Sequence, residues 1–143
     1  MGWVIVLFDA DCGFCRWAMA RALRLDRRDL LVAVPIQSEL GGELLADLSA
    51  SERLSAVHVV EEEGQRRSAG AAAAAVLAAL APTRALARLA LRSPGRTELL
   101  YAAVAGRRGH LGRLVSARAR RRADRVLQAS SVTTAAELAA RRR

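Results

Sequence analysis

The chain has 143 residues, which is enough for one domain whose hydrophobic core needs no disulfide or metal to hold it together. Hydrophobic residues make up 52% of the chain but aromatic residues only 3%, so Leu, Val and Ala must fill that core. The formal net charge of +9 arises in residues 107–143, where 11 Arg stand against two acidic residues, whereas 12 Arg and 12 acidic residues balance in residues 1–106. The basic character therefore belongs to the last quarter of the chain and not to the rest.

Neither a membrane span nor a secretory signal is expected. The apolar run near the N-terminus covers only residues 3–8, and no basic residue precedes it. The Ala-rich run at 68–83 is uncharged, but it is shorter than the ~20 apolar residues that a membrane span needs. We therefore expect a cytoplasmic protein without membrane contact. In that compartment a close pair of cysteines is more often catalytic or metal-binding than a structural disulfide.

The apolar runs and helical periodicities alternate along the chain. Strands are predicted at residues 3–8, 30–34, 56–60 and 65–68, and helices at residues 13–25, 39–48, 69–80, 82–91 and 96–105. The first two strands are apolar on both faces, as in a parallel or mixed sheet that is covered on both sides. Gly64 after three glutamates predicts a hairpin turn. The order β-α-β-α-β-β-α predicts a thioredoxin-like α/β domain over residues 1–115, with a small mixed sheet flanked by helices.

Residues 116–143 are predicted to form an Arg-rich helical tail, part of which is expected to be disordered. Apolar residues recur at helical spacing between Leu111 and Leu127 among many arginines. Two interpretations stay open for this pattern: an amphipathic helix packed on the domain, which we favour, and a basic surface for nucleic acid or an acidic partner.

The densest chemistry lies between the first strand and the first helix, where Cys12 and Cys15 are the two cysteines of the chain. A Cys-x-x-Cys at the start of a helix places Cys12 where unpaired N–H groups and the helix dipole stabilise a thiolate. Cys15 follows one turn later on the same face, within bonding reach. This spacing predicts that Cys12 attacks a disulfide and that Cys15 resolves the mixed disulfide that results.

Charged neighbours of the pair act in opposite directions. Arg16 favours a thiolate, whereas Asp9 and Asp11 oppose it if they point toward Cys12. Either aspartate is also a candidate general base that takes the proton of Cys15 at the resolving step. The alternative is that both aspartates serve only to form the turn and the helix cap.

The same residues are also compatible with three other interpretations. Structural zinc needs four ligands, and His58 and His110, the two histidines, are not spaced as a ligand pair. Asp9 and Asp11 after a buried strand resemble the first motif of haloacid dehalogenase-type phosphotransferases, but the chain has no lysine to hold the phosphate. Two inert, buried thiols are less expected at a strand-to-helix turn. No metal is therefore predicted.

The residues around the cysteines also resemble a known family. Phe8-Asp9-Ala10-Asp11-Cys12-Gly13-Phe14-Cys15 is similar to the signature of the DCC family of thiol-disulfide oxidoreductases, whose members open with a buried strand and Asp-x-x-Cys-x-x-Cys. The resemblance covers about residues 3–115 and includes the Gly turn and Ala-rich helix at 64–80, Pro94-Gly95, Tyr101 and Arg107-Arg108.

The resemblance implies a thioredoxin-like fold and a protein disulfide oxidoreductase, with Cys12 and Cys15 as the redox pair and Asp9 as the signature acid. The sequence departs from ordinary thioredoxins because no proline lies between Pro35 and Pro82, so the cis-proline that usually faces the cysteines is missing. The Gly-Phe dipeptide inside the motif is closer to that of glutaredoxins, which suggests glutathione as a redox partner.

We therefore predict a thiol-disulfide oxidoreductase without a cofactor, which acts on a disulfide or dithiol of a protein or of a low-molecular-weight compound. The alternative from another class is a non-enzymatic interaction protein whose Arg-rich C-terminal helix binds an acidic partner or nucleic acid. Of these two, nucleic acid is the less expected partner because basic runs alone are a weak signal.

Overall fold

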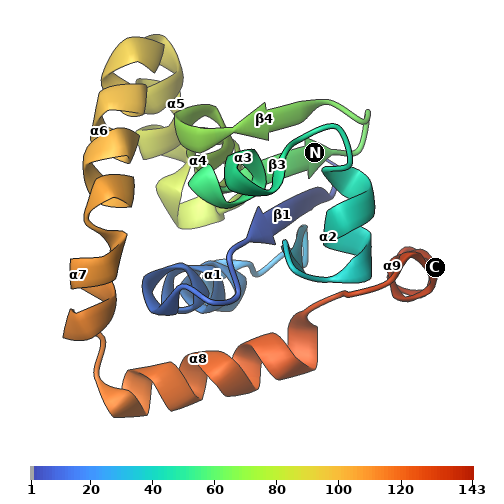
Figure 1. Cartoon of the computed structure of the whole chain (residues 1–143). Helices are drawn as coiled ribbons and strands as arrows, with labels where there is room; N and C mark the ends of the chain where they lie inside the picture. The colour runs from blue at the N-terminus through green and yellow to red at the C-terminus, as the bar shows by residue number, and fades with distance from the viewer. Residues whose placement is uncertain (1) are drawn as a thin grey trace.

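The computed structural model describes residues 2–143, which form a four-stranded sheet with helices packed on both faces (Figure 1). The strands lie in the order β2-β1-β3-β4. Their bounds are β1 Val4–Phe8, β2 Leu31–Pro35, β3 His58–Glu61 and β4 Arg66–Ser68. Strand β1 pairs in parallel with β2 and antiparallel with β3, and β3 pairs antiparallel with β4. The carboxyl ends of β1 and β2 therefore lie side by side, which positions the site described below.

The helices follow the chain order of Figure 1. They are α1 Gly13–Leu25, α2 Glu39–Leu44, α3 Ala50–Ser55, α4 Ala69–Ala79, α5 Arg84–Arg92, α6 Pro94–Gly106, α7 Arg108–Leu114, α8 Ala117–Ser130 and α9 Ala135–Arg141, with a short 3-10 turn η1 at Ala81–Thr83. Among the described residues no single helix is long and apolar enough to cross a membrane, while α4 and the segment Ala81–Arg92 pass that test only together and are bent by 116°.

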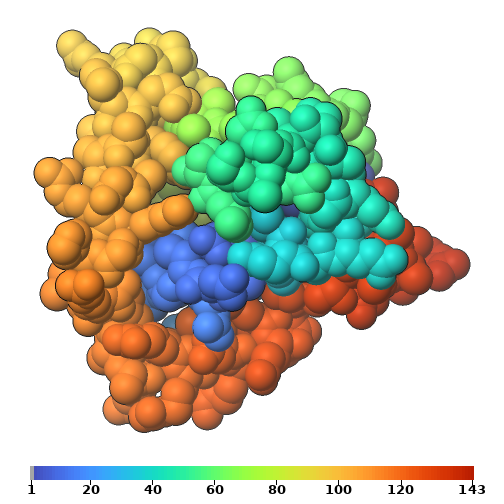
Figure 2. All heavy atoms as spheres, in the orientation of Figure 1, coloured from blue at the N-terminus to red at the C-terminus, as the bar shows by residue number. Residues whose placement is uncertain are grey.

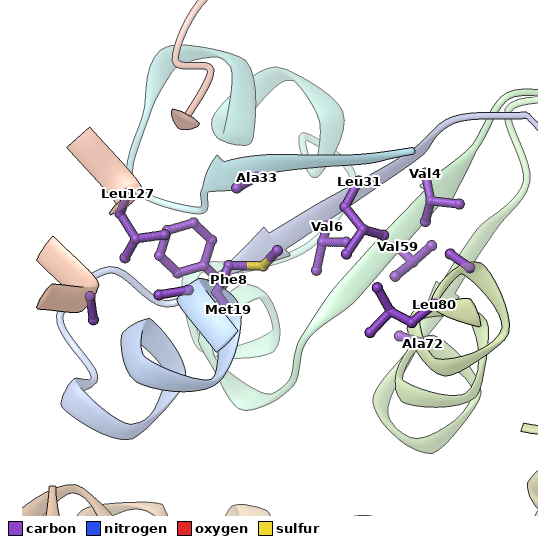
Figure 3. Close-up of a cluster of buried hydrophobic side chains, with 13 residues drawn as sticks. Val4, Val6, Phe8, Met19, Leu31, Ala33, Val59, Ala72, Leu80 and Leu127 are labelled. Carbon is purple, nitrogen blue, oxygen red and sulfur yellow. The ribbon is translucent and has the colours of Figure 1, made fainter. Parts of the chain in front are cut away.

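The alternating side chains of β1 supply two hydrophobic cores, one on each face of the sheet. Val4, Val6 and Phe8 pack with residues of α1, α4 and α8 on the first face. Figure 3 shows Phe8, Met19 and Leu127 grouped at one end of this core and Val59, Ala72 and Leu80 at the other. On the second face lie Ile5, Leu7, Val32, Val34, Ile36, Leu40, Leu45, Val132 and Leu138. All five side chains of β1 are buried because both faces are covered.

The predicted α/β architecture and helical C-terminal region are confirmed, and the layout is consistent with a thioredoxin-like fold. Two elements differ from expectation. The helix expected at 39–48 ends at Leu44, and a separate helix α3 follows, because Ser49 and Glu52 form a capping box that starts a new helix. The third strand begins at His58 instead of residue 56, since the backbone N–H of Val57 bonds the side chain of Tyr101.

The tail runs across the domain and ends beside β2. Helix α8 packs along α1, buries Ala123 and Leu127 in the first core, and carries Asp124, which forms an ion pair with Arg16. Beyond α8 the backbone N–H of Val132 donates to the carbonyl of Ala33 in β2 at 2.8 Å. The division of the chain at residue 115 and the disorder expected in part of the tail stay predictions.

Candidate active site

The cysteine pair lies where β1 ends and α1 begins. Cys12 is the N-cap residue of α1, with extended backbone angles of φ −90° and ψ 113°. Its Sγ accepts a hydrogen bond from the backbone N–H of Cys15 at 3.3 Å, and its carbonyl accepts the helical bond from Arg16 at 3.0 Å. The predicted placement of Cys12 at the helix start is therefore correct. The N–H of Cys15, which lies in the first turn and donates to this sulfur, and the positive end of the helix dipole both act on Cys12 Sγ.

Both cysteines are free thiols and are partly buried within the described residues. In Figure 2 the start of α1, in blue, reaches the molecular surface between α7 and α8, in orange. Cys12 directly follows the exposed Asp11, while Cys15 lies one turn further into the helix.

The two thiols differ in their electrostatic environment. The pKa of Cys15 is raised from 9.0 to about 12. Burial is the largest cause, followed by the hydrogen bond to Cys12 and the charge of Cys12. The positive charge of Arg108 lowers the pKa of Cys15, and the negative charge of Asp9 raises it. Cys15 is therefore a protonated thiol at neutral pH, and in this form it does not attack a disulfide.

The two aspartates lie in a turn that is held by a residue outside the motif. Asp9 Oδ1 accepts hydrogen bonds from the backbone N–H of Asp11 at 3.0 Å and from Gln37 Nε2 at 2.8 Å. Gln37 Nε2 also donates to Asp11 Oδ2 at 3.3 Å, and Gln37 Oε1 accepts from the N–H of Ala10 at 3.0 Å. Both aspartates thus shape the turn, and Asp9 also lines a cavity together with Cys15.

Sequence reasoning missed Gln37. It follows β2 directly, and parallel pairing of β1 with β2 brings the two carboxyl ends together at one edge of the sheet. In open α/β sheets this edge is where ligands and functional side chains gather, so the parallel pairing was the signal that could have found it.

Arg108 is a positive charge that acts on Cys15. Arg16 points to α8, where it pairs with Asp124. Arg108 opens α7, donates to the carbonyl of Leu54 at 3.0 Å, and lies near enough to Cys15 for its charge to act on that thiol. The ion pair with Asp124 engages the Arg16 guanidinium on the α8 side, and its expected effect on a Cys12 thiolate stays a prediction.

The loop before β3 closes the other side of the site. The N–H of Val57 donates to Tyr101 Oη at 2.9 Å, and the carbonyl of Val57 accepts from the N–H of Ala69 at 3.0 Å. No cis peptide bond occurs in residues 2–143. Both hydrogen-bonding groups of the Val57 backbone are therefore occupied from within the chain.

A cavity of about 440 Å³ opens beside Cys15, between α1, α4, α6 and this loop. Its lining is almost wholly apolar and includes Phe14, Trp17, Val76, Leu77 and Val104. The charged residues of the lining are Asp9, Arg21 and Arg108. The arrangement can hold an apolar group against the cysteine pair.

The two histidines take no part in this arrangement. His58 is buried, its Nδ1 lies 2.7 Å from Ser68 Oγ, and its Nε2 lies 3.0 Å from the carbonyl of Arg53. Since a carbonyl only accepts, Nε2 carries the proton and Nδ1 accepts from the serine. Within residues 2–143 no group of three or more His, Cys, Asp or Glu side chains is placed to hold a metal ion.

Comparison with known proteins agrees with the chemistry of this site. No curated protein and no solved structure matches the chain significantly. A family model described as DCC1-like thiol-disulfide oxidoreductase matches residues 6–114, which include the end of β1, both cysteines, Gln37, Tyr101 and Arg108. Because this match spans well over half of the sequence, the chain belongs to the DCC1-like thiol-disulfide oxidoreductase family.

Proposed function

We propose that the protein is an enzyme that exchanges a dithiol for a disulfide, with Cys12 as the attacking thiolate and Cys15 as the resolving thiol. The observation that carries the proposal is the asymmetry of the pair: a helix N–H donates to Cys12 Sγ, while burial raises the pKa of Cys15 to about 12. Thiolates, and not thiols, attack disulfides.

In the first step the Cys12 thiolate attacks one sulfur of a substrate disulfide R–S–S–R. A bond forms between Cys12 Sγ and that sulfur, the substrate S–S bond breaks, and the first R–S⁻ leaves and takes up a proton from water. Cys12 is then part of a mixed disulfide and no longer carries a negative charge.

That change prepares the second step. The hydrogen bond to Cys12 and the charge of Cys12 both contribute to the high pKa of Cys15, so their loss in the mixed disulfide lowers the pKa of the resolving thiol. Arg108 then favours the Cys15 thiolate, and Asp9, in the same cavity wall, is the proposed base that accepts its proton. Asp11 is assigned a role in the turn because its carboxylate accepts from Gln37.

In the second step the Cys15 thiolate attacks Cys12 Sγ and the second R–S⁻ leaves. The protein ends as a Cys12–Cys15 disulfide, two R–SH are released, and two electrons have passed from the protein dithiol to the substrate. A cellular dithiol or glutathione would return the protein to its reduced form. We propose a cytoplasmic setting for this cycle, where such reductants are present.

Two serine variants treated with hydroxyethyl disulfide test these roles. Cys15→Ser should retain the mercaptoethanol adduct on Cys12, because no resolving thiol is present, and an intact mass will show it. Cys12→Ser should form no adduct at neutral pH, because the remaining thiol has a raised pKa. Equal adduct formation by both variants, or by neither, would refute the assigned roles.

A second candidate function is binding of an acidic partner, and one observation favours it. Arg21 and Arg24 of α1 and Arg118 and Arg122 of α8 line one groove of about 190 Å³ between the two helices. Helix α8 contributes to the core, so the test replaces side chains and keeps the helix. The double variant Arg118→Gln/Arg122→Gln should lose salt-sensitive binding to heparin. Unchanged retention on heparin would refute this candidate.

A further inference from the structure

We propose that the cavity beside Cys15 binds the body of the substrate, and that the preferred substrates are low-molecular-weight disulfides with an aliphatic chain that ends in a carboxylate. This inference rests on the proposed disulfide exchange and adds the substrate class to it. Three features of the site carry it: the apolar lining, the occupied backbone of Val57, and the charges at the cavity wall.

The lining selects an apolar body. The cavity of about 440 Å³ is walled by Phe14, Trp17, Val76, Leu77 and Val104 and falls within the size range of small-molecule sites. Water in such a cavity finds few polar partners, so filling it with an aliphatic chain is favourable. Cys15 is part of the same wall, so the bound chain emerges beside the redox pair.

The backbone of Val57, which lines the same cavity as Cys15, offers no free hydrogen-bonding group to a peptide substrate. A peptide that adds itself alongside a protein strand needs a free N–H and a free carbonyl on that strand. The N–H of Val57 donates to Tyr101 Oη and its carbonyl accepts from Ala69, so neither is free. A peptide would have to displace Tyr101, whereas an aliphatic chain enters the cavity without breaking a hydrogen bond.

The charges favour an acidic end group. Arg21 and Arg108 are two of the three charged residues of the lining. The third, Asp9, already accepts hydrogen bonds from Gln37 and from the turn backbone. Because Arg108 acts on Cys15 at the disulfide end of the chain, a carboxylate at the other end is attracted to Arg21, which lies further along α1.

The proposed substrate enters the exchange described above without a further reactant. One equivalent of the reduced protein and one of the disulfide yield the protein disulfide and two ω-mercapto acids, and the two electrons come from the protein. Single-turnover measurements with reduced protein therefore need no added reductant.

The test compares two disulfides with two variants of α6. Ala105 lines the cavity, whereas Ala103 lies on the exposed face of the same helix. The rates are measured with the symmetrical disulfide of ω-mercaptooctanoic acid and with hydroxyethyl disulfide. Ala105→Phe should lower the ratio of the first rate to the second by about tenfold, as expected when a hydrophobic pocket is obstructed. Ala103→Phe should leave both rates unchanged, and Ala73→Leu on α4 repeats the obstruction if Ala105→Phe does not fold.

A binding measurement separates failure of this inference from failure of the proposed exchange. Trp17 lines the cavity, so octanoate should change its fluorescence in a Trp3→Phe background, and Ala105→Phe should abolish the change. If hydroxyethyl disulfide is not reduced but octanoate binds in this way, the exchange is wrong and the cavity assignment stands. If octanoate does not bind, or if the ratio of rates is the same in Ala105→Phe as in the native protein, the substrate class is wrong.

Discussion

Alkylation of Cys15 by iodoacetamide should be suppressed about a thousandfold by folding. Only the thiolate reacts, and burial and the neighbouring Cys12 raise the pKa of Cys15 from 9.0 to about 12. Below pH 9, a rise of one in the pKa lowers the thiolate fraction tenfold, so a rise from 9.0 to about 12 lowers that fraction by ~10³. The unfolded protein in urea is the reference, because there Cys15 has its ordinary pKa.

The assay quenches the reaction over time and quantifies the peptide that contains each alkylated cysteine by mass spectrometry. The unfolded rate should level off above pH 9, whereas the native rate of Cys15 should continue to rise, because its pKa is higher. In Cys12→Ser the suppression should be smaller but still present, since burial is its largest cause and the effect of Cys12 comes second.

A native rate that levels off near pH 9, or one within about threefold of the unfolded rate, would contradict the assignment of Cys15 as a protonated thiol. The proposed division of roles between the cysteines would then lose its electrostatic basis.

Three further predictions concern the surroundings of the site. Gly41→Ala should destabilise the protein by about 1–3 kcal/mol in urea, because its Cβ would lie 2.3 Å from the carbonyl oxygen of Pro35. Gly42→Ala should not, because its Cβ would meet only the end of the Arg53 side chain at 3.9 Å. Burial lowers the pKa of His58, so the unfolded state binds a proton at this residue more readily than the folded state. The free energy of unfolding contributed by His58 should therefore be complete above pH 6.5 and decrease as the pH falls below it. His58→Gln should remove this pH dependence, whereas His110→Gln should not. Tyr101→Phe should cost about 1–3 kcal/mol in thermal unfolding, since a backbone N–H loses its acceptor.

The start of the site could be predicted from local sequence. A buried apolar run followed by a turn and a helix places Cys12 at a helix N-terminus, and the structure begins α1 at Gly13 as predicted. This succeeds because β1 is apolar at every position and α1 has a clear periodicity, so local preference and tertiary packing agree.

The environment of the pair could not be predicted in the same way. Gln37 meets Asp9 only because β2 pairs in parallel with β1, across 28 positions of sequence. Arg108 acts on Cys15 from α7, and Arg16 pairs with Asp124 of α8, and both contacts depend on how these helices pack on α1. Charge effects depend on distance in space, which sequence proximity does not give.

A cavity is also a property of packing and has no sequence signature. The residues that line it look like ordinary core positions of α1, α4 and α6, and α6 carries Tyr101, whose hydroxyl occupies the Val57 N–H. The start of α3, in contrast to the cavity, could have been predicted, because the Ser-x-x-Glu pattern of Ser49 and Glu52 is typical of a helix N-terminus.

A redox titration of the cysteine pair tests the central claim most directly. The protein is equilibrated in glutathione buffers of increasing potential, and the loss of two hydrogen atoms per chain is followed by intact mass. We predict one two-electron transition between the dithiol and the Cys12–Cys15 disulfide within roughly −320 to −220 mV, the range of cytoplasmic glutathione. A pair that stays reduced across this range, or that forms only adducts with glutathione and never the internal disulfide, would contradict the account.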